Sequence, residues 1–204
     1  MNRLHYLLTC LMLVPAAPAQ AGPPPPATAK AVFAGGCFWG VDAVFKHVKG
    51  VVSVVSGYAG GKAATARYAI VSSGMTGHAE SVEVTYDSTQ ISYRRLLEVF
   101  FAVAHDPTQL NRQGPDVGPQ YRSAIFYMSA DQRDVAQAYI AELTRARAFP
   151  KPIVTQVVAL ERFYAAEAYH QNYLANHMTQ PYIVYHDLPK LRALERRFPE
   201  LYRP

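Results

Sequence analysis

Strand-like and helix-like segments alternate along residues 30–204, and this alternation constrains the fold more than any other feature. Alternating or β-branched residues predict strands over 30–35, 51–56, 78–87, 121–127 and 153–160. Apolar spacing of three and four predicts helices over 37–50, 92–104, 165–176 and 190–201, and another after Ser129. No dinucleotide fingerprint follows a strand. We predict an α+β two-layer sandwich with a central mixed sheet and flanking helices; a doubly wound parallel sheet is the alternative.

Two long stretches, residues 62–77 and 105–120, lack a periodic pattern and are predicted to be loops. The second contains three Pro and two Gly. Loops as long as the second one in a compact domain are usually either functional or disordered.

The first 21 residues are typical of a secretory signal. Arg3 supplies a positive start, residues 7–14 are mostly apolar, and Ala19-Gln20-Ala21 has the small-x-small pattern of a cleavage site. The apolar run is too short to span a bilayer, and lipidation at Cys10 is a second interpretation. We predict a signal peptide over 1–21, a Pro/Ala-rich linker over 22–29 and a single domain over 30–204. The chain is therefore predicted to be exported, to a periplasm or to the medium, without stable membrane insertion.

Composition excludes several classes of protein. Half of the 204 residues are hydrophobic and 17% are charged, which excludes a disordered chain. The net charge of +5 is small and no Lys/Arg-rich run is present, so nucleic acid is not an expected partner. Cleavage after Ala21 would leave Cys37 as the one cysteine of the mature chain, which cannot then form an intramolecular disulfide.

The most informative stretch is Gly35-Gly36-Cys37-Phe38-Trp39-Gly40. Two glycines permit a tight strand-to-helix turn that places Cys37 at the start of a helix, where backbone N–H groups favour a nucleophilic thiolate. Phe38 and Trp39 are predicted to wall an apolar pocket beside it. The alternative is a buried, inert Cys37 with packing aromatic residues. Ligands at zinc-like spacing are absent from the sequence, so no metal is expected.

Glu80 is the second candidate. It shares one face of its predicted strand with Val82 and Val84, so its side chain is expected to point toward the apolar side. Burial would keep the carboxyl group protonated and able to donate a proton. The alternative is a first strand residue that frays into solvent. His78 is either a turn residue or a catalytic one.

Two functions are consistent with these residues taken alone. A thiol hydrolase or acyltransferase would need a histidine beside Cys37, and His78, His105 and His170 are candidates. A non-catalytic module would use the Phe38-Trp39 pocket to bind methionine-rich segments.

Five motifs occur in an order that resembles a known family and favours a third function. They are Gly36-Cys37-Phe38-Trp39-Gly40, Gly57-Tyr58-Ala59-Gly60-Gly61, Gly77-His78-Ala79-Glu80, the run from Asp116 to Ser123, and the run from Ala166 to Leu174. Together they resemble the A-type peptide methionine sulfoxide reductases, and the resemblance covers about residues 30–188. It implies an α+β two-layer sandwich, in agreement with the pattern above.

The resemblance also implies roles for individual residues. Cys37 would attack the sulfur of methionine-S-sulfoxide, free or in a protein, and Glu80 would protonate its oxygen. Phe38 and Trp39 would hold the S-methyl group. Tyr68 and Tyr121 would donate hydrogen bonds to the sulfoxide oxygen, Asp116 matches the family's loop aspartate, and Tyr182 is expected on the substrate side. Cys37 would be left as a sulfenic acid.

The sequence departs from many family members in having no cysteine after Cys37, as in Gln180-Pro181-Tyr182-Ile183-Val184-Tyr185. It resembles the subgroup with a single catalytic cysteine, whose sulfenic acid is reduced by an external thiol. No bound cofactor is expected. The expected partners are oxidised proteins and peptides and an exported reductant, which is a small thiol, a glutaredoxin-like protein or a thioredoxin-like protein. We expect a monomer that repairs proteins after oxidative damage.

Overall fold

The computed structural model describes residues 27–204, so the predicted signal peptide and residues 22–26 of the predicted linker lie outside the described residues. The strands are β1 (Thr28–Gly35), β2 (Val51–Ala59), β3 (Ala79–Asp87), β4 (Arg112–Gln113), β5 (Asp116–Val117), β6 (Ser123–Tyr127), β7 (Gln156–Ala159) and β8 (Phe163–Ala165). The α-helices are α1 (Phe38–Lys46), α2 (Tyr68–Val71), α3 (Tyr93–Val99), α4 (Ala130–Arg145), α5 (Tyr173–Asn176) and α6 (Leu188–Arg197). No helix in this part of the chain is long and apolar enough to cross a membrane.

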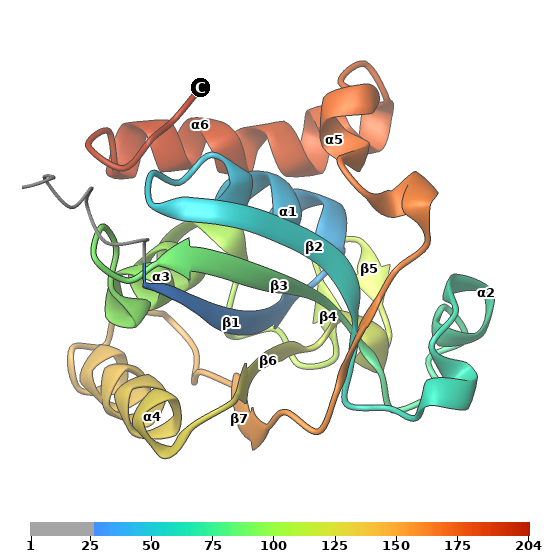
Figure 1. Ribbon diagram of the computed structural model, residues 1–204, viewed down its shortest axis with the longest axis horizontal. Coiled ribbons are helices and arrows are strands. Elements are labelled where there is room, and N and C mark those ends of the chain that lie inside the picture. Colours follow the sequence, from blue (N-terminus) through green and yellow to red (C-terminus); the bar gives the residue numbers. More distant parts are fainter. Residues whose placement is uncertain (1–26) are drawn as a thin grey trace, which may run out of the picture.

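A mixed sheet of six strands forms the centre of the domain, in the order β7-β6-β1-β3-β2-β8 (Figure 1). The β6–β7 pair is parallel and the other pairs are antiparallel. Strands β4 and β5 form a separate hairpin within the loop that was predicted over 105–120. The predicted α+β class and mixed sheet are confirmed, and the doubly wound parallel alternative is wrong.

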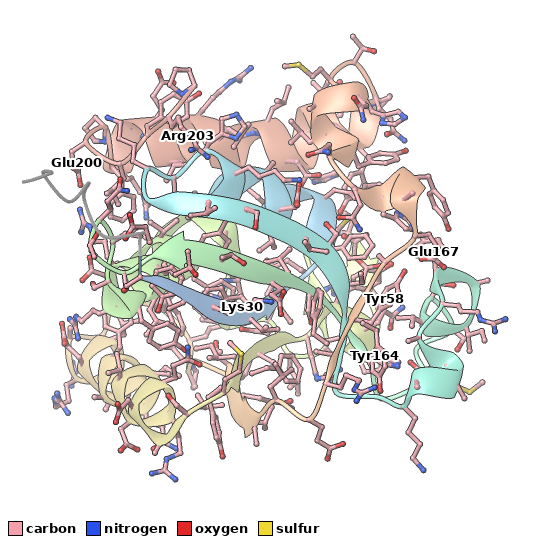
Figure 2. All side chains as sticks on the ribbon, in the orientation of Figure 1. Lys30, Tyr58, Tyr164, Glu167, Glu200 and Arg203 are labelled. Atoms are coloured by element: carbon pink, nitrogen blue, oxygen red, sulfur yellow. The ribbon has the colours of Figure 1, made fainter. Side chains whose placement is uncertain are left out.

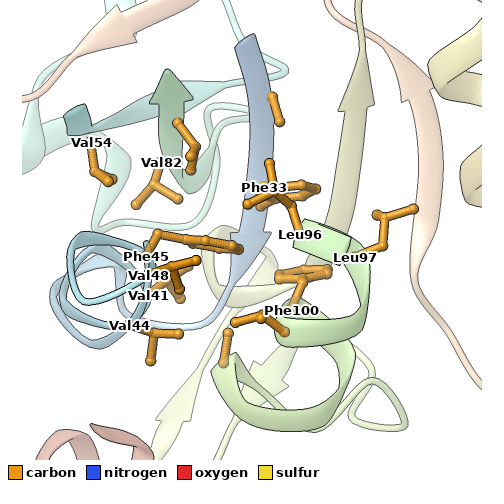
Figure 3. Packing of buried hydrophobic residues seen from close by; sticks show 14 of the residues in the cluster. Phe33, Val41, Val44, Phe45, Val48, Val54, Val82, Leu96, Leu97 and Phe100 are labelled. Carbon is orange, nitrogen blue, oxygen red and sulfur yellow. The ribbon is translucent and has the colours of Figure 1, made fainter. Parts of the chain in front are cut away.

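The main core lies between one face of this sheet and the helices. Helix α1 packs on β2 and β3, α6 packs on α1, and α4 packs on α3, β6 and β7. Phe33 of β1 stacks between Phe45 of α1 and Phe100, with ring centroids 5.2 and 4.9 Å away (Figure 3). All of these helices thus cover the same face, which makes the domain a two-layer structure.

The opposite face carries a smaller cluster of buried residues, which includes Val32, Ala59, Ala79 and Phe126. The connection between β7 and β8 crosses this face, and Leu160 packs against the cluster. Beyond it the chain pairs as β8 with the outer edge of β2, which brings residues 163–170 toward the start of α1 and α2 (Figure 1).

The predicted helix over 165–176 is largely wrong. Ala165 ends strand β8, residues 168–170 form a single 3-10 turn, and only Tyr173–Asn176 is α-helical. The side chain of Gln171 accepts a hydrogen bond from the Ser56 N–H and donates one to the Ser56 carbonyl, and Asn172 has a left-handed backbone with φ of 55°. Pairing with the edge of β2 therefore overrides local helical spacing.

Smaller differences concern element ends. Strand β1 begins at Thr28, inside the predicted linker, and β6 begins at Ser123 because Pro119–Tyr121 form a 3-10 turn. The predicted helix over 92–104 continues beyond Val99 as a π-helical turn over Phe100–Ala104. Ser129 caps α4 as predicted, since its hydroxyl accepts the Gln132 N–H.

Replacing Phe33 by Ala is expected to lower the free energy of unfolding by about 3–5 kcal/mol, because the side chain is fully buried and its loss leaves a cavity between two rings. Urea denaturation followed by circular dichroism measures this. Met75→Ala is the control, because Met75 is 88% exposed and its truncation should change stability by less than about 0.5 kcal/mol. Equal effects of the two substitutions would contradict the assigned core.

Candidate active site

Cys37 lies immediately before helix α1, at the turn that follows β1. The preceding residue, Gly36, has φ of +91°, and a Cβ there would lie 2.5 Å from Cβ and Cγ of Gln113. Both the backbone conformation and the lack of space therefore require glycine. The turn places the sulfur where the sequence predicted it, at the start of a helix.

The electrostatic surroundings of Cys37 differ from those expected. The residue is only 8% exposed, and burial raises the pKa of its thiol well above the ordinary value. Negative charge on Glu80 and on Asp187 raises this pKa further, whereas the Trp39 N–H and the Lys190 ammonium lower it. The Trp39 N–H favours the thiolate, as predicted, but desolvation outweighs it, so the thiol is the favoured form in the substrate-free protein at neutral pH.

Glu80 is buried, with 2% exposure, on the helix-covered side of β3, as the strand pattern predicted. Its Oε2 accepts a hydrogen bond of 3.1 Å from the N–H of Phe38, the residue next to Cys37. Burial raises the pKa of Glu80 to about 8, with a further contribution from Asp116, although the Phe38 N–H acts in the opposite direction. The carboxyl group is therefore mostly protonated at neutral pH.

Aromatic rings surround the start of α1. Phe38 is buried and its ring lies 5.0 Å from that of His170. The half-buried Trp39 donates from Nε1 to Nδ1 of His170 at 3.2 Å, stacks on Tyr173 at 3.6 Å and meets the edge of Tyr182 at 6.0 Å. The indole is thus held in one orientation by three partners from the C-terminal part of the chain.

Tyr68 and Tyr121 lie close to the same groups. Tyr68 is the first residue of α2, and its ring lies 4.4 Å from that of His170. Burial raises the pKa of Tyr68 and of Tyr121, and Glu80 and Cys37 raise both further. Both hydroxyl groups therefore stay protonated and can donate hydrogen bonds near the sulfur.

Asp116 and Tyr182 complete the site from two other segments. The Tyr182 hydroxyl donates to Oδ2 of Asp116 at 2.5 Å. A cavity of about 150 Å³ beside Cys37 is lined in part by these two residues and by Lys190. The structure thus brings together every residue that the sequence predicted for the site, although they come from segments up to 145 positions apart, from Cys37 to Tyr182.

The three histidines considered as a base for Cys37 have other hydrogen-bond partners. His78 contacts the Lys62 carbonyl, and both nitrogens of His105 are hydrogen-bonded, to the Phe100 carbonyl and to the Ser123 hydroxyl. Within residues 27–204 no histidine forms a hydrogen bond with the Cys37 sulfur, and no cluster of three His, Cys, Asp or Glu side chains could hold a metal ion. The described residues therefore show no hydrogen-bonded Cys–His pair of the kind that a thiol hydrolase uses.

Sequence reasoning missed three residues around the site. They are Tyr173, Asp187 and Lys190. Tyr173 stacks on Trp39. The fully buried Asp187 pairs with Lys190, whose Nζ lies 3.1 Å from Oδ1 of Asp187 and which lines the cavity. A Cβ on Gly40 would lie 2.1 Å from Oδ1 of Asp187, so this carboxylate packs against the first turn of α1. Only Tyr173 carried a signal, since it lies in the last of the five motifs.

Known proteins resemble this chain in sequence and in structure. The family model described as peptide methionine sulfoxide reductase matches residues 29–201. Peptide methionine sulfoxide reductase MsrA 2 of Mesorhizobium japonicum is 55% identical over 177 residues, which are 87% of this chain and 91% of that protein. MsrA 2 of a Synechocystis species is 54% identical over 171 residues, 84% of this chain and 80% of that protein.

Solved structures of the family share the fold. Reduced Mxr1 from Saccharomyces cerevisiae is 32% identical with a TM-score of 0.68, over 75% of this chain and 87% of that one. Methionine sulfoxide reductase A of Corynebacterium diphtheriae is 34% identical with a TM-score of 0.66, over 76% of this chain and 78% of that one.

These likenesses, together with the convergence of the predicted residues on Cys37, decide among the functions considered. They support an oxidoreductase and neither the hydrolase nor the non-catalytic binding module. The chain belongs to the peptide methionine sulfoxide reductase family, as an A-type member with peptide-methionine (S)-S-oxide reductase activity.

Proposed function

We propose that Cys37 is the nucleophile and Glu80 the proton donor in the reduction of methionine-S-sulfoxide, free or in proteins. The observation that carries this proposal is the hydrogen bond from the Phe38 N–H to Glu80, which fixes a buried acid with a pKa of about 8 next to the cysteine. Sulfoxide reduction needs such an acid, because the oxygen leaves far more readily once it is protonated.

The first half of the cycle, up to the Cys37 sulfenic acid, needs only the enzyme and the sulfoxide. The Cys37 sulfur attacks the sulfoxide sulfur while Glu80 gives its proton to the oxygen, and the proton lost from the thiol restores Glu80. The attack forms a bond between the two sulfur atoms. This bond and the S–O bond of the substrate then break as the hydroxyl group passes to the Cys37 sulfur. A thiol and a sulfoxide thus become a sulfenic acid and a thioether, which is released as methionine.

Different side chains around Cys37 contact different parts of the substrate. Phe38 and Trp39 present an apolar wall for the S-methyl group, held by His170 and Tyr173. Tyr68 and Tyr121 donate hydrogen bonds to the sulfoxide oxygen. Asp116 accepts the Tyr182 hydroxyl in the wall of the cavity, which supports a substrate-binding role for Tyr182.

An external thiol completes the cycle. The chain contains cysteines only at positions 10 and 37, and cleavage of the leader would leave Cys37 alone. A first external thiol condenses with the sulfenic acid and releases water, and a second reduces the resulting mixed disulfide. The reductant is a small thiol or a glutaredoxin-like or thioredoxin-like protein, and the enzyme belongs to the single-cysteine subgroup.

The pH dependence tests the role of Glu80. Because the protonated carboxyl group is the active form, kcat/KM for the sulfoxide is expected to fall as the pH rises through about 8. Glu80→Gln should lower kcat by about 100-fold or more, within the range of general acid catalysis, and should abolish this fall. Steady-state rates measured between pH 6 and 10 check both expectations. Glu161→Gln is the control, since Glu161 is exposed on the crossing segment. A fall near pH 8 that persists in Glu80→Gln would assign the titration to another group.

The leader predicts export with protein repair outside the cytoplasm. Expression of the full chain in a bacterial host should yield, in the periplasmic fraction, a mature protein that begins at Gly22 and has 183 residues, that is, 204 minus 21. Intact mass and N-terminal sequencing measure this. The control carries Ala19→Leu and Ala21→Leu, which remove the small residues of the cleavage site. An unprocessed wild-type chain confined to the cytoplasm would contradict the proposal.

A further inference from the structure

Glu167 lies in the last sequence motif, and the reaction proposed above gives it no role. It follows β8 on the segment that runs from the edge of the sheet toward α5, and Figure 2 labels it beside Tyr58. Its two carboxylate oxygens have different partners. Oε2 accepts the Tyr58 hydroxyl and Oε1 accepts the backbone N–H of Tyr68, both at 2.9 Å.

The Tyr58 end of this link is rigid. Tyr58 is fully buried in β2, directly opposite Glu80 in the β2–β3 register, and its ring lies 5.9 Å from that of Phe38. The hydroxyl that Glu167 binds therefore belongs to the same packed layer as the acid and the start of α1.

The Tyr68 end needs an external partner. Tyr68 begins the four-residue helix α2, and no side-chain hydrogen bond comes from the residue before it, Arg67. Glu167 accepts the N–H that would otherwise lack this partner, and its carbonyl accepts the N–H of His170, whose ring lies 4.4 Å from that of Tyr68. One residue thus fixes the backbone of Tyr68 and begins the turn that carries the ring beside it.

We propose that Glu167 is a positioning residue that fixes Tyr68 relative to Tyr58 and the Glu80 strand, so that the Tyr68 hydroxyl points at the reacting sulfoxide oxygen. This inference rests on the proposed function of Tyr68 as an oxygen-binding donor. Without the two hydrogen bonds, α2 loses its attachment to the sheet edge and the hydroxyl loses its fixed direction.

Two substitutions at this position separate hydrogen bonding from packing. Glu167→Met keeps the length of the side chain and removes both acceptors. We expect kcat to fall by about 10- to 100-fold, which is less than the roughly 100- to 1000-fold for loss of an oxyanion donor itself, because the Tyr68 hydroxyl is retained. Glu167→Gln should keep kcat within about threefold, because its amide oxygen can accept the Tyr68 N–H while its NH₂ group donates to Tyr58. Glu161→Gln, at an exposed position on the connection between β7 and β8, should leave kcat unchanged.

A double-mutant cycle with Tyr68→Phe tests whether Glu167 acts through the Tyr68 hydroxyl. A merely structural role of Glu167 would give the same loss of kcat with and without that hydroxyl. Tyr68→Phe alone should lower kcat by about 10-fold or more. If Glu167 acts through the Tyr68 hydroxyl, adding Glu167→Met to Tyr68→Phe should lower kcat by less than about twofold further. Thermal melting of each variant verifies that it is folded under the assay conditions.

Each outcome separates the inference from the function on which it rests. If Tyr68→Phe lowers kcat and Glu167→Met lowers it further by its full factor, the inference is overturned while the proposed function of Tyr68 stands. If Tyr68→Phe leaves kcat unchanged, the proposed function of Tyr68 is wrong and the inference falls with it. Should Glu167→Met not fold, Tyr58→Phe takes its place in the cycle, since it removes one hydrogen bond; an additive effect again overturns the inference.

Discussion

The hydrogen bond from the Phe38 N–H to Glu80 is the contact on which the site depends. It joins the first residue of α1 to the central strand β3, and so fixes the acid relative to the neighbouring Cys37. Burial of the carboxyl group raises its pKa to about 8, whereas an exposed carboxyl group would be ionised at neutral pH. The fold thus supplies a protonated acid beside a thiol, and the sheet behind β3 supplies the rigidity.

The other side chains of the site come from loops and from the sheet edge at β8. A few hydrogen bonds and close contacts hold these segments beside Cys37 and Glu80. The 105–121 loop is anchored where Gln113 packs beneath Gly36 and bonds both the N–H and the carbonyl of Asp106. From the opposite side, the segment after β8 brings Glu167 and His170 against α2 and Trp39. The sheet therefore carries the acid and leads into the turn that holds Cys37, and irregular segments line the cavity around them.

The sequence predicted those features of the site that depend on local pattern. Strand alternation indicated that Glu80 points inward, and two glycines before Cys37 indicated a tight turn at a helix start. It did not predict the raised pKa of the Cys37 thiol, because desolvation and the charge of Asp187 arise from segments far apart in the chain. The helix expected over 165–176 was wrong for the same kind of reason, since pairing of β8 with β2 decides the backbone there.

The most direct test of the account is a single turnover without reductant. The mature protein is mixed with methionine-S-sulfoxide, and the methionine released per enzyme is counted while the intact mass is recorded. We expect about one equivalent of methionine, one added oxygen on Cys37, no intramolecular disulfide, and no release from Cys37→Ser. Folded, reduced protein that releases no methionine, or a Cys37→Ser variant that does, would contradict this expectation.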